Sequence, residues 1–178
     1  MTQMSTSYDS LWDIGVIDID GHPINKLREI FPAGKKLALI VNVASQAALA
    51  DTNYEALIDL YNRYEKHGLE IIAFPCNQFG KQEPWNEKEI KAYVKERWDV
   101  PFPIMHKVKV NGWECDEVFK FLRSQTPMFV DKSQSPQLHG GTKMALKIKD
   151  ISGNFCKFFV DAEGHVVDCL PLETDDPR

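Results

Sequence analysis

The sequence predicts an α/β fold with a mixed central sheet flanked by helices. Two apolar segments, 37–43 and 69–75, have strand length and no helical period, which is typical of strands buried on both faces. A helical pattern lies between them, so this part predicts a βαβ unit with parallel strands. Near the C-terminal end, 155–161 and 165–170 flank Ala162-Glu163-Gly164 and predict an antiparallel hairpin. Parallel and antiparallel strands together make the sheet mixed.

The chain length fits one domain with a sizeable core. We expect residues 1–10 to form a flexible tail and residues 11–178 to form a single domain. Residues 11–27 alternate around Asp20-Gly21, a two-residue turn signal, and predict an N-terminal β-hairpin.

Three helices are predicted from their start signals. Thr52-Asn-Tyr-Glu55 matches a capping box and opens a helix that Gly68 ends. Asn86 is expected to cap a second helix, and a third is predicted over 116–124.

Two further stretches complete the chain. Residues 105–110 are predicted to be extended, and residues 125–150 to form a long surface loop, a kind that is usually functional or mobile. The order is then hairpin, strand, helix, strand, two helices and a final hairpin. A thioredoxin-like fold fits this order best.

Charge and composition exclude several classes of function. The net charge is −5, and basic residues alternate with acidic ones, so we expect no nucleic-acid partner. No apolar run approaches the roughly 20 residues that cross a bilayer, and no signal peptide is visible at the start. We therefore expect no membrane insertion and an intracellular, cytoplasmic location.

The cysteines and histidines show no ligand spacing. Cys76, Cys115, Cys156 and Cys169 are far apart and never form a C-x-x-C pair. They are expected to be reduced and mostly buried, as in intracellular proteins. Since the five histidines are also isolated, neither a metal nor another cofactor is predicted.

Several motifs occur in an order that resembles one known family, the glutathione peroxidases. They are Asn42-Val-Ala-Ser45, Phe74-Pro-Cys-Asn-Gln-Phe-Gly80, Gln82-Glu-Pro84, Phe102-Pro-Ile104, Lys107-Val-Lys-Val-Asn-Gly112 and Asn154-Phe-Cys-Lys-Phe158. The resemblance runs from about Ser10 to Pro171 and implies a thioredoxin fold. It also implies reduction of hydroperoxides by a selenocysteine or cysteine, which glutathione or a thioredoxin-type dithiol then restores.

The resemblance assigns four groups to the reaction, and they can be checked one at a time. The nucleophile of the family corresponds to Ala47, and Ala48 stands where glycine is usual. The glutamine is retained as Gln78 and the asparagine as Asn154, whereas Gly153 replaces the tryptophan. Two of the four groups are therefore missing, including the nucleophile.

Three interpretations follow from this comparison. In the first, the chain is a pseudo-peroxidase in which Gln78 and Asn154 only satisfy backbone groups of their loops. In the second, Cys76 acts as an alternative nucleophile of an active thiol peroxidase that uses glutathione or thioredoxin. In the third, the chain is an engineered inactive enzyme, although Ala48 and Gly153 are more than a single cysteine replacement would produce.

The expected fold also lacks the C-terminal helix of the family. A sheet face without its helix exposes apolar strand surface, and such patches usually contact a partner. The favoured interpretation is a structural or interaction subunit that binds another protein or a larger assembly through that face. A homo-oligomer is the weaker form of the same hypothesis.

Overall fold

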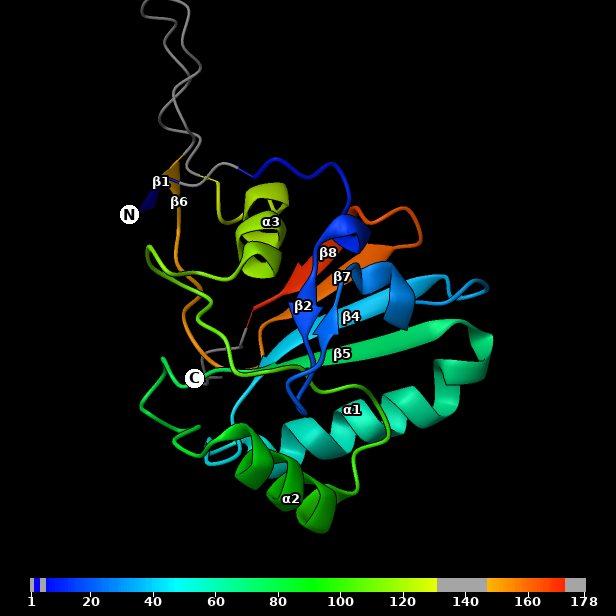
Figure 1. The fold of residues 1–178 in the computed structure, drawn as a ribbon, viewed down its shortest axis with the longest axis vertical. Helices are drawn as coiled ribbons and strands as arrows, with labels where there is room; N and C mark the ends of the chain where they lie inside the picture. The colour runs from blue at the N-terminus through cyan, green and yellow to red at the C-terminus, as the bar shows by residue number, and fades with distance from the viewer. Residues whose placement is uncertain (1, 4–5, 131–146, 172–178) are drawn as a thin grey trace, which may run out of the picture.

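The computed structural model describes residues 2–3, 6–130 and 147–171 of the chain (Figure 1). Its centre is a four-stranded sheet in the order β5-β4-β7-β8. The parallel pair is β4 (Leu37–Val43) and β5 (Leu69–Pro75). On its other side, β4 pairs antiparallel with β7 (Lys157–Asp161), which pairs with β8 (Val166–Leu170). The mixed sheet and the C-terminal hairpin are confirmed.

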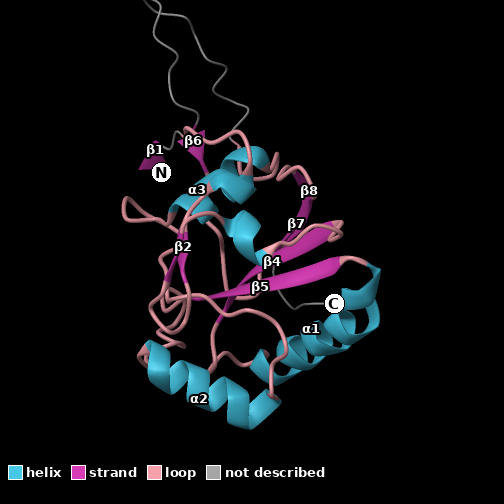
Figure 2. Ribbon diagram, turned by 45° about the vertical axis from the view of Figure 1, so that its right-hand side comes forward, coloured by secondary structure: helices cyan, strands magenta, loops and turns pink. Residues whose placement is uncertain are grey.

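Both faces of β4 are buried, as its apolar run predicts. Ala38 and Ile40 face a core layer that includes the buried side of α3 (Glu117–Gln125). Leu39 and Val41 face the opposite layer, which holds α1 (Ala50–Tyr64) and α2 (Glu87–Trp98). Figure 2 shows α1 and α2 together, with α3 apart from them. Because alternate residues of a strand point to opposite faces, one apolar segment supplies both layers.

The second helix is capped by the residue that the sequence predicts, and the third begins one residue later than predicted. The Asn86 side chain accepts a hydrogen bond from the N–H of Glu89 at 3.0 Å, and the Glu89 carboxylate accepts one from the N–H of Asn86. This reciprocal pair is a capping box. At α3, Asp116 accepts from the N–H of Val118 at 2.9 Å and caps the helix.

The predicted start of the first helix was wrong by two residues. α1 begins at Ala50, after Leu49, and no side chain caps it. Ala50 is buried against the core, and alanine is the strongest helix former. Burial and helix propensity therefore extend the helix from Thr52 toward the N-terminus, as far as Ala50. A short 3₁₀ helix, η3 (Glu65–His67), follows α1 and ends at Gly68, whose φ of 106° lies in the left-handed region.

The N-terminal hairpin is confirmed but short. It pairs β2 (Val16–Ile17) with β3 (Pro23–Ile24), in a two-stranded sheet of its own. The segments on either side are 3₁₀ helices, η1 (Leu11–Asp13) and η2 (Leu27–Ile30), instead of strand. Both carry buried residues of the layer that contains α3.

Three expectations about irregular segments need correction or lie outside the described residues. Within the expected tail at 1–10, β1 (Thr2–Gln3) pairs with β6 (Lys147–Ile148), which falls inside the expected loop 125–150. The stretch 131–146 of that loop lies outside the described residues. Residues 105–110 form no regular strand, although a bridge joins Asp18 to Met105 and the N–H groups of Met105 and Val108 donate to carbonyls of β5 at 2.8 and 2.9 Å. Two prolines just before Met105 remove backbone donors from that edge.

No helix within the described residues combines the length and the apolar character that crossing a membrane requires.

Candidate functional site

The candidate site lies at the end of β4, where the chain passes into α1. Ala47 is half-buried there, and the following two residues are exposed. The N–H of Gln46 donates to the carbonyl of Gln82 at 2.9 Å, which ties this turn to the loop after β5. Open α/β sheets place their ligands at such strand ends, beside a helix N-terminus.

A hollow of about 350 Å³ opens beside Ala47. Nine residues from three segments line it: Ala47, Ala48, Leu49, Phe79, Gly80, Gln82, Gly153, Asn154 and Phe155. The structure thus brings together Ala47, Gly153 and Asn154, three of the five candidate site residues. Ala47 lies more than 100 positions away from the other two in the sequence. We call this hollow the Ala47 pocket. Its lining contains no cysteine, and all nine lining residues belong to the described part of the chain.

The side chain of Asn154 is held within this pocket by one side chain from another segment. Its Nδ2 donates to Gln82 Oε1 at 2.9 Å, whereas its buried Oδ1 has no hydrogen-bond partner among the described residues. The expectation that Asn154 satisfies backbone groups was therefore wrong. The preceding Gly153 carbonyl accepts from Asn42 Nδ2 at 3.0 Å, which anchors the turn to β4.

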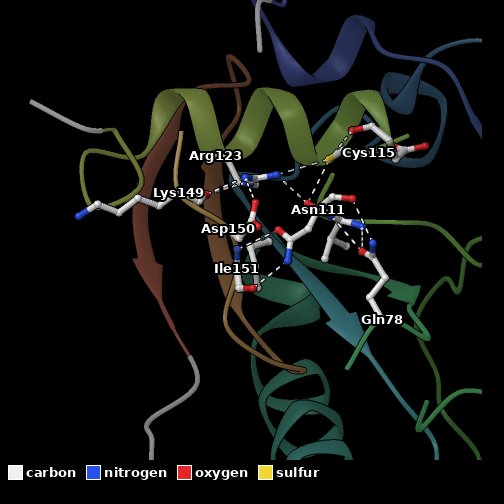
Figure 3. A network of polar contacts seen from close by, with 9 residues as sticks. Gln78, Asn111, Cys115, Arg123, Lys149, Asp150 and Ile151 are labelled. Carbon is white, nitrogen blue, oxygen red and sulfur yellow. Dashed lines mark hydrogen bonds and ion pairs between the residues drawn. The ribbon is translucent and has the colours of Figure 1, made fainter. Parts of the chain in front are cut away.

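Gln78 lies outside the pocket lining and binds a different loop (Figure 3). Its Oε1 accepts from the N–H groups of Val110 and Asn111 at 2.7 and 3.0 Å. Its Nε2 donates to the carbonyl of Asn111 at 3.0 Å. Every polar atom of the Gln78 amide is thus used by backbone, as the sequence led us to expect for this residue.

Cys76 does not reach the pocket either. It is fully buried, and its Sγ lies 3.8 Å from Gln78 Oε1. Burial raises the pKa of the Cys76 thiol, which disfavours the reactive thiolate.

Sequence reasoning missed the acidic residue that supports the site. Glu83 is completely buried, and its Oε2 accepts from the N–H and the hydroxyl of Ser45 at 2.8 and 3.0 Å. Burial raises the pKa of the Glu83 carboxyl, because the charged form is kept away from the water that would stabilise it. The buried hydroxyl of Tyr54 and Glu83 Oε1 have no hydrogen-bond partner among the described residues. The only signal for Glu83 in the sequence was its place within Gln82-Glu-Pro84.

One group of side chains offers metal-ligand atoms. Atoms of Asp18, Asp20 and His22 lie within 4.8 Å of one another on the exposed β2–β3 turn. Asp18 Oδ1 already accepts from the N–H groups of the other two residues, and Asp20 pairs with Lys91 at 2.7 Å. These contacts stabilise the hairpin turn.

Comparison with known proteins places this architecture in one family. The model of the family described as glutathione peroxidase matches residues 11–123, which is more than half of the chain. The chain belongs to the glutathione peroxidase family. The thioredoxin-like fold and the resemblance deduced from the motifs are thereby confirmed.

Individual members of the family give the same assignment. An Arabidopsis thaliana protein named probable phospholipid hydroperoxide glutathione peroxidase 6, mitochondrial, is 41% identical over 164 residues. The match covers 92% of this chain and 62% of that relative. A Helianthus annuus probable phospholipid hydroperoxide glutathione peroxidase is 44% identical, with 75% and 64% covered. The chain therefore spans a little less than two thirds of the length of these two relatives.

A solved structure agrees with the sequence matches. The crystal structure of T. cruzi GPX1 superposes with a TM-score of 0.63 at 28% identity. The superposition covers 91% of this chain and 86% of that one.

Proposed function

We propose that this chain is a glutathione-peroxidase-like protein that does not catalyse peroxide reduction and that serves as a structural or interaction subunit. The observation that carries the proposal is the methyl group of Ala47 in the pocket at the end of β4, where the family resemblance expects the nucleophile. A methyl group can neither ionise nor attack an O–O bond. Loss of a nucleophile removes several orders of magnitude in rate.

The surroundings of Ala47 support the same conclusion. Gly153 contributes no side chain to the pocket, and Gln78 is occupied by the backbone of Val110 and Asn111. The groups that would polarise a thiolate are thus absent or engaged elsewhere.

The alternative of an active thiol peroxidase depends on Cys76. Its position beside Gln78 favours this alternative, but its complete burial and raised pKa weigh against it. A nucleophilic cysteine is normally found in an electropositive, partly exposed environment with a lowered pKa. Engineering of the nucleophile position would account for Ala47 but leaves Gly153 unexplained.

Peroxide consumption tests these alternatives. The wild-type chain is assayed with hydrogen peroxide or an organic hydroperoxide, using glutathione or thioredoxin as the reductant. We expect no turnover above the rate without protein. Turnover that disappears in Cys76→Ser but persists in Cys115→Ser would overturn the proposal in favour of the thiol peroxidase.

The interaction role rests on apolar surface near the β7–β8 edge of the sheet. Leu170 and Val167 are 51% and 56% exposed on β8, one of the two edge strands of the sheet. On the α1 side of the sheet, a hollow of about 220 Å³ is lined by Leu37, Phe159 and neighbouring residues. We call Phe159, Val167 and Leu170 the β7–β8 patch. Its exposure supports binding of a protein partner or a second copy of the chain.

An intracellular, cytoplasmic location belongs to the same proposal. The four cysteines are free, which supports a reducing compartment. The Arabidopsis relative carries the word mitochondrial in its name, so fractionation should compare the cytosol with mitochondria.

A further inference from the structure

Two cysteines that the resemblance gives no role lie side by side in the C-terminal hairpin. Cys156 immediately precedes β7, and Cys169 lies on β8, the edge strand. Their sulfur atoms are 3.8 Å apart. Both side chains belong to the core layer that contains α3, whereas Phe155, which lines the Ala47 pocket, faces the opposite layer. The pair is therefore separate from the proposed degenerate site.

We infer that Cys156 and Cys169 form an oxidisable dithiol, which a hydroperoxide converts into a disulfide across the hairpin. A disulfide bond needs a sulfur–sulfur distance of about 2 Å, so one side chain must approach the other by roughly 2 Å. Such a shift is within reach of side-chain rotation and a small movement of a strand edge. This modification is independent of the proposed loss of turnover.

The two cysteines have unequal freedom to move. The N–H of Cys156 donates to the side-chain oxygen of Asn42 at 3.0 Å, which holds this residue against the central strand β4. Cys169 lies on a strand whose one neighbour in the sheet is β7, where it is paired with Phe158. A bulge interrupts this pairing between Phe159 and Val160. Cys169 is 7% exposed, compared with 1% for Cys156. Opening of the edge strand therefore uncovers Cys169 first.

The position of Cys169 on the edge strand makes it the attacking sulfur, and the contact between the two sulfurs favours a thiolate there. A hydrogen bond from the Cys156 thiol lowers the pKa of Cys169, and the same contact raises the pKa of Cys156. The thiolate of Cys169 attacks one oxygen of the hydroperoxide. The S–O bond forms as the O–O bond breaks, and the alkoxide takes up a proton to leave as an alcohol.

The second step closes the disulfide. The sulfur of Cys156 attacks the sulfenic sulfur of Cys169, the S–S bond forms, and hydroxide leaves with the Cys156 proton as water. Two thiols are oxidised by two electrons in total, and one hydroperoxide is reduced to an alcohol and water. The reaction is stoichiometric, with one hydroperoxide consumed per chain, because a disulfide buried in the core layer is out of reach of glutathione and thioredoxin in the folded protein.

Peptide mapping tests the inference directly. The reduced chain is treated with one equivalent of tert-butyl hydroperoxide, denatured, alkylated and digested with trypsin without reduction. Cleavage after Lys157 separates the two cysteines, so a disulfide would join peptide 150–157 to peptide 158–178. We expect loss of two of the four alkylatable thiols and recovery of both on treatment with dithiothreitol.

A double variant, Cys76→Ser with Cys115→Ser, provides the matched control. Those thiols are equally buried, and burial raises the pKa of Cys115 to about 11. We expect the double variant to form the joined peptide to the same extent as the wild type. In Cys156→Ser, the joined peptide should vanish and dimedone should trap a sulfenic acid on Cys169.

Two results would overturn the inference. One is full alkylation of all four wild-type thiols after oxidation. The other is a disulfide that involves Cys76 or Cys115 in place of the Cys156–Cys169 pair. Both are read from the wild-type chain, so neither depends on whether a variant folds. Peroxide turnover is measured separately, which keeps this outcome distinct from the proposed function.

Discussion

At the scale of single residues, the pocket at the end of β4 is built on well-defined hydrogen bonds around the methyl group of Ala47. Asn42 and Gln82 still hold the turn at 153–154 through hydrogen bonds of 3.0 and 2.9 Å. Ala47 is held at the start of α1 by the bond from the N–H of Ala50 to its carbonyl. A side chain introduced at position 47 would therefore occupy a defined, partly open place.

Ala47→Cys is expected to introduce one reactive thiol. The α1 N-terminus favours a thiolate, and position 47 is half-buried, whereas the native cysteines are almost fully buried. Iodoacetamide should modify this cysteine about tenfold faster than the native thiols, as measured by mass spectrometry over time. Ala50→Cys is the matched control, because the same residue type is buried three positions further along the helix. Equal rates at both positions would contradict an accessible pocket.

Glu83 predicts a pH dependence with a definite sign. Burial raises the folded-state pKa of this carboxyl above its usual value of 4.5. At a pH between 4.5 and the raised pKa of the folded state, the folded state binds a proton that the unfolded state has released. Its contribution to stability is therefore fully present below pH 4.5 and is lost as the pH rises through the folded pKa.

Glu83→Gln removes this titration while keeping a carbonyl oxygen for Ser45. Urea unfolding of both proteins across a pH series should show the stability of the wild type, relative to the variant, falling as the pH rises above 4.5. A relative stability that increases with pH would contradict a raised pKa.

At the scale of secondary-structure elements, a buried arginine joins α3 to two other segments (Figure 3). Arg123 is completely buried, and its guanidinium donates to the carbonyls of Val110 and Lys149 at 2.9 and 2.7 Å. It also pairs with Asp150 at 2.9 Å. Because the same loop at 110–111 holds Gln78, this network ties α3 to the vicinity of Cys76.

Arg123→Met should destabilise the fold by about 3 kcal/mol, because it leaves buried carbonyls without their donors. Asp150 is 57% exposed, so Asp150→Asn should cost less than about 1 kcal/mol. Urea unfolding monitored by circular dichroism measures both values. Equal losses of stability in the two variants would show that the ion pair with Asp150 contributes most of the stabilisation by Arg123, and the buried carbonyl contacts little.

At the scale of the whole molecule, the described helices cover the central sheet unevenly. Described residues of α1 and α2 fill the layer on one side of β4 and β5, and residues of α3, η1 and η2 fill the layer on the other side. The β7–β8 patch remains partly open at the opposite edge. This placement makes the patch the natural contact surface of the proposed interaction subunit.

Lysine substitutions in the β7–β8 patch should weaken association. Size-exclusion chromatography with light scattering, on lysate and on pure protein, is expected to show a complex or oligomer for the wild type. Val167→Lys with Leu170→Lys should shift it toward monomer, because a charged side chain cannot be buried unpaired at an interface. Ile17→Lys is the control, at a residue 47% exposed on the hairpin of the opposite layer. A wild-type chain that is monomeric in both samples would contradict the proposed role.

The sequence by itself determined the family and the mixed sheet, and it marked Ala47 as the position where the family resemblance expects the nucleophile. Strand segments with continuous apolar runs, capping signals such as Asn86 and closely spaced motifs are local patterns, so they can be recognised without coordinates. The start of α1 could not be predicted in this way, because burial of Ala50 overrode the local capping signal.

Only the tertiary structure decided which distant side chains meet. It joined Ala47 with Gly153 and Asn154, turned Gln78 toward another loop and buried the Glu83 carboxyl. It also brought the sulfur atoms of Cys156 and Cys169 to 3.8 Å, although neither residue belongs to a recognisable cysteine motif. Strand register and side-chain burial set these contacts, and both depend on how the whole sheet is assembled.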